Sequence, residues 1–152
     1  MEKKSLQIEQ LNSKMQVVAE IKKITPPPTG WIKAVRSALG ITLQQLGNKI
    51  SITKQSIQDI ERREKEGSVT LKTLRDVANA LDMELVYGFV PKDGSLDALI
   101  YRKSKELATQ IVSRTSNTMM LKEQQNSPQR LQKAIEEKTG DIKYEMPKQL
   151  WD

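Results

Sequence analysis

Hydrophobic residues recur along most of this chain at spacings of three and four residues, which is typical of short amphipathic helices. The clearest case is the segment 42–63, TLQQLGNKISITKQSIQDIERR, whose hydrophobic positions are Leu46, Ile50, Ile52, Ile57 and Ile60. These positions fit two helical faces meeting at an angle better than one continuous helix. Thr42 and Thr53 are each placed as an N-cap, and Gly47 stands where the two helices would press closest together.

Helices are also expected before and after this pair. Residues 31–39 place Trp31, Ile32, Val35 and Leu39 toward the core, with Lys33 and Arg36 outward and Gly40 as the stop. Thr70 caps a further helix whose stripe is Leu71, Leu74, Val77, Ala78 and Leu81. The segment 31–81 therefore predicts four short helices around one small core.

An N-terminal helix is predicted over residues 5–24, with one apolar stripe at Ile8, Leu11, Met15 and Val18. The stripe fits a helix docked on its own core or one packed on a second subunit as a short coiled coil, and the sequence leaves both open. Residues 25–30, TPPPTG, end this helix. Three consecutive prolines favour a stiff extended spacer over a motif for a proline-binding module.

Residues 84–91, ELVYGFVP, change the pattern from helical spacing to alternation. This is the one convincing strand in the sequence, and a lone strand leaves its backbone groups unpaired. We expect it to pair with the same strand of a second copy about a two-fold axis. An extended tail lying on the helical core is the alternative. The predicted dimer interface consists of Leu85, Val86, Tyr87, Phe89 and Val90.

The C-terminal part predicts a long helix from residue 96 to about 125, then a second helix that begins at Ser127 and Pro128 and stops at Gly140. The tail DIKYEMPKQLWD is expected to be irregular, and its Leu150–Trp151 end fits docking on its own core or on a partner. The predicted organisation is an N-terminal helix (1–25), a domain of four short helices with a dimerising strand (26–91) and a C-terminal helical extension (92–152). The fold class is mainly α, with one short β-strand.

Composition narrows the functional classes. The chain has 152 residues, a net charge of +6, an isoelectric point near 9.5, and neither cysteine nor histidine. Thiolate metal sites, disulfides and histidine-based catalytic triads are therefore excluded, and the basic balance favours an anionic partner. No signal peptide, membrane-spanning run or phosphate-binding loop is evident. We expect a cytoplasmic, non-enzymatic protein that needs no cofactor.

A helix-turn-helix that binds double-stranded DNA fits these patterns. Ile57 and Ile60 face inward, so the second helix presents the candidate base contacts Lys54, Gln55, Gln58 and Asp59. For Asp59 a local salt bridge to Arg62 or Arg63 is an equally good interpretation. The candidate phosphate contacts are Thr42, Gln44, Lys49, Thr53, Ser56, Arg62 and Arg63.

The hydrophobic positions of 42–63, together with Gly47, resemble the helix-turn-helix signature of the Xre/Cro family of phage-repressor-like regulators. The run 53–58, TKQSIQ, resembles a recognition helix of that family, and Glu61 matches the glutamate that commonly ends it. Two positions depart from the pattern. Ser51 replaces a glycine at a turn position that needs positive φ, and Leu43 replaces a phosphate-binding glutamine.

A resemblance over nearly the whole chain is to the family called mobile mystery protein A. It is carried by LQIEQLNSKM, PPPTGWIKAVRSALGIT, VTLKTLRDVANALDMELVYGFVPK and the terminal QLWD. Members are found beside mobile mystery protein B, which carries a Fic domain. The resemblance implies a lambda-repressor-like bundle and a transcription regulator in a toxin–antitoxin-like pair. It also implies a second possible role, as an antitoxin that sequesters the Fic-domain partner directly.

Overall fold

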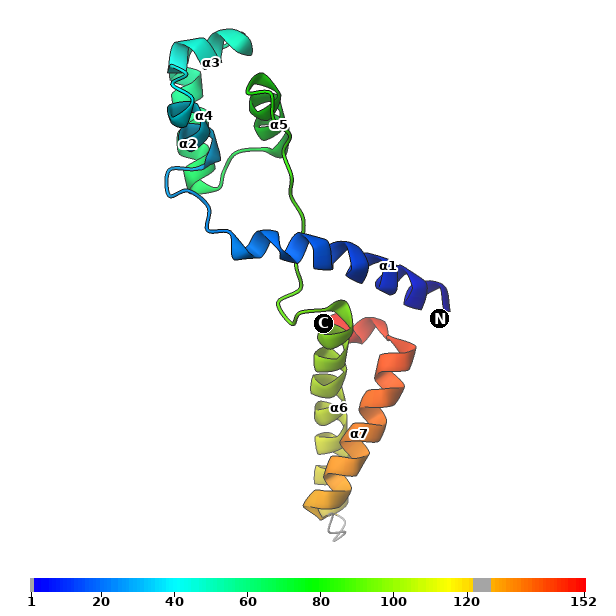
Figure 1. Cartoon of the computed structure of the whole chain (residues 1–152). Coiled ribbons are helices and arrows are strands. Elements are labelled where there is room, and N and C mark those ends of the chain that lie inside the picture. Colours follow the sequence, from blue (N-terminus) through cyan, green and yellow to red (C-terminus); the bar gives the residue numbers. More distant parts are fainter. Residues whose placement is uncertain (1, 122–126) are drawn as a thin grey trace. The chain divides into compact units, whose positions relative to one another are not determined.

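The computed structural model describes residues 2–121 and 127–152, with side chains described for 3–117 and 127–152. The fold is helical (Figure 1). In chain order the elements are α1 (Glu2–Ala19), η1 (Ile21–Lys23), α2 (Trp31–Ala38), α3 (Leu43–Lys49), α4 (Lys54–Glu66), α5 (Leu71–Ala80), α6 (Leu96–Leu121), α7 (Pro128–Glu145) and η2 (Lys148–Trp151), where η marks a 3₁₀-helix. No helix in the described ranges combines the length and apolarity needed to cross a membrane.

The chain forms two compact units. One comprises residues 22–88 and holds α2 to α5; the other comprises residues 1–21 and 89–152 and holds α1, α6, α7 and η2. The division at 1–25, 26–91 and 92–152 stays a prediction.

The four helices α2 to α5 enclose the core that the sequence predicted. Its buried residues are Ile32, Leu46, Ile57, Val77 and Leu81, with Ile50, Ile52, Ile60 and Leu74 packed partly buried around them. Three outer positions differ from their prediction. Trp31 and Leu39 are 51% and 58% exposed, because they lie in the first turn and at the C-cap of the eight-residue α2. Leu71 is 43% exposed, because it is the first residue of α5.

The second unit is built on the antiparallel pair α6 and α7, which run side by side (Figure 1). Its buried apolar residues are Ile100, Ala108, Ile142 and Leu150, and Ile8 of α1 packs against them. Asn12 of α1 fixes the start of α6: its Oδ1 accepts the Leu96 N–H at 2.8 Å, and its Nδ2 donates to Asp97 at 3.1 Å. α1 therefore docks on its own core within this unit, which is the first of the two predicted alternatives; the other was packing on a second subunit.

The C-terminal region differs from its prediction in two ways. Ser127 caps α7 and Pro128 begins it as expected, but the helix continues through Gly140 to Glu145. It ends at Met146, a non-glycine residue with φ of +47°. The tail is then ordered rather than irregular, because η2 carries Leu150 into the core with only 3% of its surface exposed.

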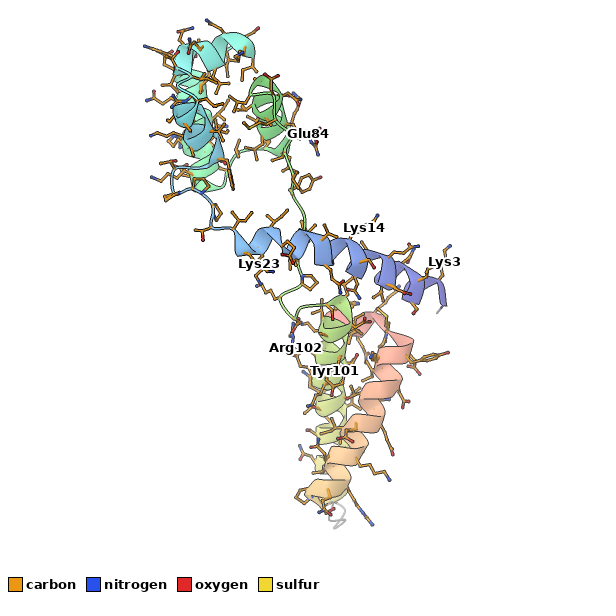
Figure 2. The ribbon with its side chains drawn as sticks, in the orientation of Figure 1. Lys3, Lys14, Lys23, Glu84, Tyr101 and Arg102 are labelled. Atoms are coloured by element: carbon orange, nitrogen blue, oxygen red, sulfur yellow. The ribbon has the colours of Figure 1, made fainter. Side chains whose placement is uncertain are left out.

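The short β-strand predicted at 84–91 is not formed: the described ranges contain no strand. Residues 83–91 are non-helical in the structure, and Figure 2 places the labelled Glu84 on this segment after α5. The physical reason is that a strand needs a neighbouring strand to accept and donate its backbone hydrogen bonds, and the described chain offers none.

Candidate nucleic-acid interface

The turn between α3 and α4 is built by local signals at its two ends. The Thr42 hydroxyl accepts the Gln45 N–H at 3.0 Å while the Gln45 side chain accepts the Thr42 N–H at 2.8 Å, which is a complete capping box. Ser51 adopts φ of +59°, as expected for the position where glycine is usual. A Cβ on Gly47 would lie 2.6 Å from the Ile52 carbonyl oxygen, so only glycine lets α3 approach the turn this closely.

α4 begins with a cap of its own. The Thr53 hydroxyl accepts the Ser56 N–H at 3.1 Å and donates to the Ser56 hydroxyl at 3.0 Å. Both side chains remain exposed. Thr53 and Ser56 therefore organise the first turn of α4. If these residues contact phosphate, they do so with the same hydroxyl groups that form the cap.

An ion pair with little solvent exposure fixes α4 against α2. The Arg36 guanidinium donates to both carboxylate oxygens of Glu61, at 2.7 and 3.2 Å, and also to the Ile41 carbonyl at 3.1 Å. The side chains are only 13% and 7% exposed. Arg36 therefore points inward, contrary to its outward prediction, and its two-pronged geometry restricts how α4 can rotate or slide relative to α2.

Glu64 makes a second link between these helices. Its carboxylate accepts the N–H groups of Trp31 and Ile32, both at 2.9 Å. A carboxylate at the first turn of a helix satisfies donors that have no partner within the helix and interacts favourably with the helix dipole. Gly30 leaves space for it, since a Cβ there would lie 2.8 Å from the Glu64 carboxylate.

With its inner side held in this way, α4 presents an exposed polar face. Lys54, Gln55 and Gln58 are exposed, and none makes a side-chain hydrogen bond or ion pair with another described residue. They lie in the first five residues of α4. Gln55 lies on the side away from the buried Ile57, whereas Lys54 projects from the first turn. Their donors and acceptors are thus available to an external ligand.

Asp59 is engaged within α4. Its carboxylate is hydrogen-bonded to Arg62 and lies 2.9 Å from the Arg63 guanidinium. The hydrogen bond from Arg62, helped by the charge of Arg63, holds the pKa of Asp59 below its ordinary value. This geometry favours the local salt bridge over base contact as the role of Asp59, and it engages two arginines predicted to bind phosphate.

The remaining candidate phosphate contacts surround the same turn. Thr42 uses its hydroxyl oxygen as a cap, Gln44 donates to Asn48 at 2.8 Å, and Lys49 is exposed. Leu43, which stands where many relatives have a glutamine, is partly buried and packs against the core. Arg62 also pairs with Glu66 at 2.9 Å.

Tyr87, in the segment after α5, contacts Arg75 of α5. The Arg75 guanidinium lies 5.8 Å from the centre of the Tyr87 ring and 3.4 Å from its hydroxyl. Val86 and Phe89 nevertheless remain 68% and 80% exposed, whereas Leu85 and Val90 are partly buried.

Comparison with known families agrees with this geometry. Residues 32–87 match the family model described as helix-turn-helix, the Xre/Cro type. This segment is a helix-turn-helix domain. Helix-turn-helix domains are typically found in DNA-binding regulators. No curated protein and no solved structure matches the chain.

The sequence pattern predicts the exposed face of α4 but not the two links that hold α4 to α2. The capping threonines were recognisable because a cap acts over three residues. Arg36 and Glu61 are 25 residues apart, and Glu64 reaches α2 from 32 residues away. Glu61 was singled out only by its resemblance, and its partner was not identified.

Proposed function

We propose that this chain is a sequence-specific transcription regulator that inserts α4 of its helix-turn-helix domain into the DNA major groove. The observation that carries the proposal is the row of free polar side chains at the start of α4. In the groove, the Gln55 amide can hydrogen-bond adenine N6 and N7, and Lys54 can donate to guanine O6 or N7. Gln58 lies one turn further along the same helix and completes the base-contact set.

Phosphate contacts around the turn would set the register of α4 on the duplex. Thr42, Gln44, Lys49, Thr53 and Ser56 surround the ends of α3 and α4, where exposed polar groups suit a phosphate. The unit 22–88 also carries eleven basic against seven acidic residues, so the surrounding charge favours DNA. Arg62 and Arg63 join the set if DNA phosphate draws them away from Asp59.

We further propose that two copies bind a near-palindromic operator, most simply upstream of the protein's own gene, and repress it by occlusion. One small helix-turn-helix reads only a few base pairs, whereas a dimer places two half-sites about 34–36 Å apart. The exposed apolar side chains of Val86, Tyr87 and Phe89 support a contact between copies. A variant with Val86→Asp and Tyr87→Asp that still bound the two half-sites as cooperatively as wild type would contradict this role for the segment.

DNase footprinting on the DNA upstream of the gene tests the proposal. Wild-type protein should protect two half-sites on one face of the duplex. Lys54→Ala should lose that protection, and the matched control Lys65→Ala, which removes the same charge eleven residues further along α4, should retain most of it. Equal protection by both variants, or no protected site with wild type, would exclude α4 as the reading helix.

A second candidate is favoured by the presence of a second compact unit, residues 1–21 and 89–152, outside the matched domain. The resemblance to mobile mystery protein A suggests that such a unit sequesters a Fic-domain partner. Co-purification with the neighbouring gene product tests this role, and Gln55→Ala should leave the complex intact. The exposed Tyr144, which lines a groove between α1, α6 and α7, is the better site for a disrupting substitution. Truncation before Asp141 would also remove the buried Ile142 and Leu150.

A further inference from the structure

A groove of about 500 Å³ lies on the α6–α7 pair and is lined by these two helices alone. Its apolar floor consists of Ile111, Val112, Leu131 and Ala134, all of which remain partly exposed. The other end of the pair is covered differently, because Ile8 of α1 and Leu150 of η2 pack there around Ile100. A pair of packed helices has an apolar side that needs another element to cover it, and at this groove α6 and α7 have none within the described residues.

Four charged residues of α7 line the same groove: Arg130, Glu137, Lys138 and Asp141. None of them makes an ion pair with another described residue. Two are positive and two are negative, so the rim is balanced in charge, with Arg130 near one end and Asp141 near the other. A nucleic acid or a strongly charged protein would leave half of these charges facing a like charge.

We propose that this groove is occupied by a second copy of the same chain, with the two α7 helices antiparallel across a two-fold axis. Such an interface uses the same patch twice, which requires a patch complementary to itself. The point midway between Arg130 and Asp141 lies between Ile135 and Glu136, and the two-fold axis is placed there. In this register Arg130 of each copy therefore meets Asp141 of the other, and two α6–α7 pairs form a four-helix bundle.

The pairing has to be intermolecular. Arg130 and Asp141 are eleven residues apart on one straight helix, a rise of about 16 Å, so they cannot reach each other within one copy. The proposal also does not depend on DNA binding, because all the residues that carry it lie in the unit that holds α6 and α7. It concerns an interface separate from residues 85–90.

Cysteine cross-linking tests the contact directly, because the natural chain contains no cysteine. In the proposed register Ala134 faces Glu137 of the other copy. The two copies of an Ala134→Cys residue are therefore offset by only a few ångströms along the helix axis. A short bismaleimide should therefore join two Ala134→Cys chains efficiently at micromolar concentration. Glu136→Cys is the matched control: it lies at the same height but on the opposite, exposed side of α7, and should cross-link weakly.

Charge reversal gives a second, independent readout by sedimentation velocity on the full chain. Arg130→Asp and Asp141→Arg should each weaken self-association by roughly tenfold or more, because each creates two like-charge contacts. The double reversal should restore the wild-type affinity. Both positions are exposed, and each reversal suits the helix dipole at its end of α7, so the helix itself should remain folded. Circular dichroism checks this.

Three results would overturn the proposal. These are a wild-type chain that sediments as a monomer at these concentrations, equal cross-linking at positions 134 and 136, or a double reversal no better than the single ones. The last result would assign any observed dimer to another surface.

Discussion

Replacing Gly47 by alanine tests the close contact on which the helix-turn-helix geometry rests. The added Cβ would lie 2.6 Å from the Ile52 carbonyl oxygen and 3.3 Å from the Thr53 carbonyl carbon, both of which are backbone atoms that cannot swing aside. Restoring an ordinary contact of 3.4 Å to that oxygen requires an opening of about 0.8 Å between α3 and the turn. The same oxygen belongs to the residue whose N–H binds the Gly47 carbonyl at 2.9 Å.

The expected cost follows from two opposing effects. Overpacking of a close contact destabilises by about 1–3 kcal/mol, whereas alanine in place of a helical glycine stabilises by about 0.5–1 kcal/mol. We therefore expect Gly47→Ala to reduce the free energy of unfolding by about 1–2 kcal/mol. For a unit of this size that corresponds to a fall of roughly 5–15 °C in the melting temperature. DNA affinity should fall as well, because the opening moves α4.

Urea unfolding followed by tryptophan fluorescence provides the assay. The chain has two tryptophans, so a Trp151→Phe background leaves Trp31 as the reporter of the unit 22–88. Gly140→Ala is the matched control, followed by Trp151 in a Trp31→Phe background. A Cβ on Gly140 meets nothing within 4 Å, so that variant should be stabilised by about 0.5–1 kcal/mol. A Gly47→Ala protein as stable as wild type would refute the close-contact reasoning.

Three further substitutions test other parts of the account. Glu61→Ala should cost about 3–5 kcal/mol by chemical denaturation, because it leaves a guanidinium that is only 13% exposed without its carboxylate; a loss below 1 kcal/mol would contradict this. Asp59→Asn should raise non-specific DNA affinity and steepen its salt dependence by roughly one unit, because Arg63 is released and Arg62 keeps only its pair with Glu66. Arg62 lowers the pKa of Asp59, so the Asp59 ion pair contributes to stability above the ordinary pKa of an aspartate and is lost only as pH falls through the lowered pKa. Wild-type and Asp59→Asn protein should therefore show the same pH dependence of unfolding between about pH 6 and 8. Leu150→Ala should cost about 2–5 kcal/mol in the unit that contains α6, whereas Trp151→Ala, at a half-exposed neighbour, should cost far less; equal effects would place the tail outside the core.

Helix caps are the local signals that the sequence carries most clearly. All four predicted N-caps are formed, because a cap depends on groups only three residues apart. They are Thr42, Thr53, Thr70 and Ser127. Gly140 was misread as a stop because glycine in a helix costs only about 1 kcal/mol. The neighbouring Thr139 and Ile142 are buried and hold the helix in place, which outweighs that cost.

Non-local partners account for the other errors. Arg36 is expected to face outward because it is charged, although it lies four residues after the buried Ile32 on the same face of α2, where it meets Glu61 of another helix. The alternation of residues 84–91 does favour an extended backbone, yet a strand requires a second strand that the pattern of one segment cannot supply. The base contacts at Lys54, Gln55 and Gln58 remain predictions, because a single protein chain shows which side chains are free but not what they bind.

The central claim is that α4 reads base sequence through Gln55. The most direct test measures the binding of wild-type and Gln55→Ala protein to a library of randomised DNA duplexes at one fixed salt concentration. We predict that the variant loses the preference at one position in each half-site, a change of about 1–3 kcal/mol, while preferences elsewhere in the site are kept. Identical preference profiles for the two proteins would contradict the claim.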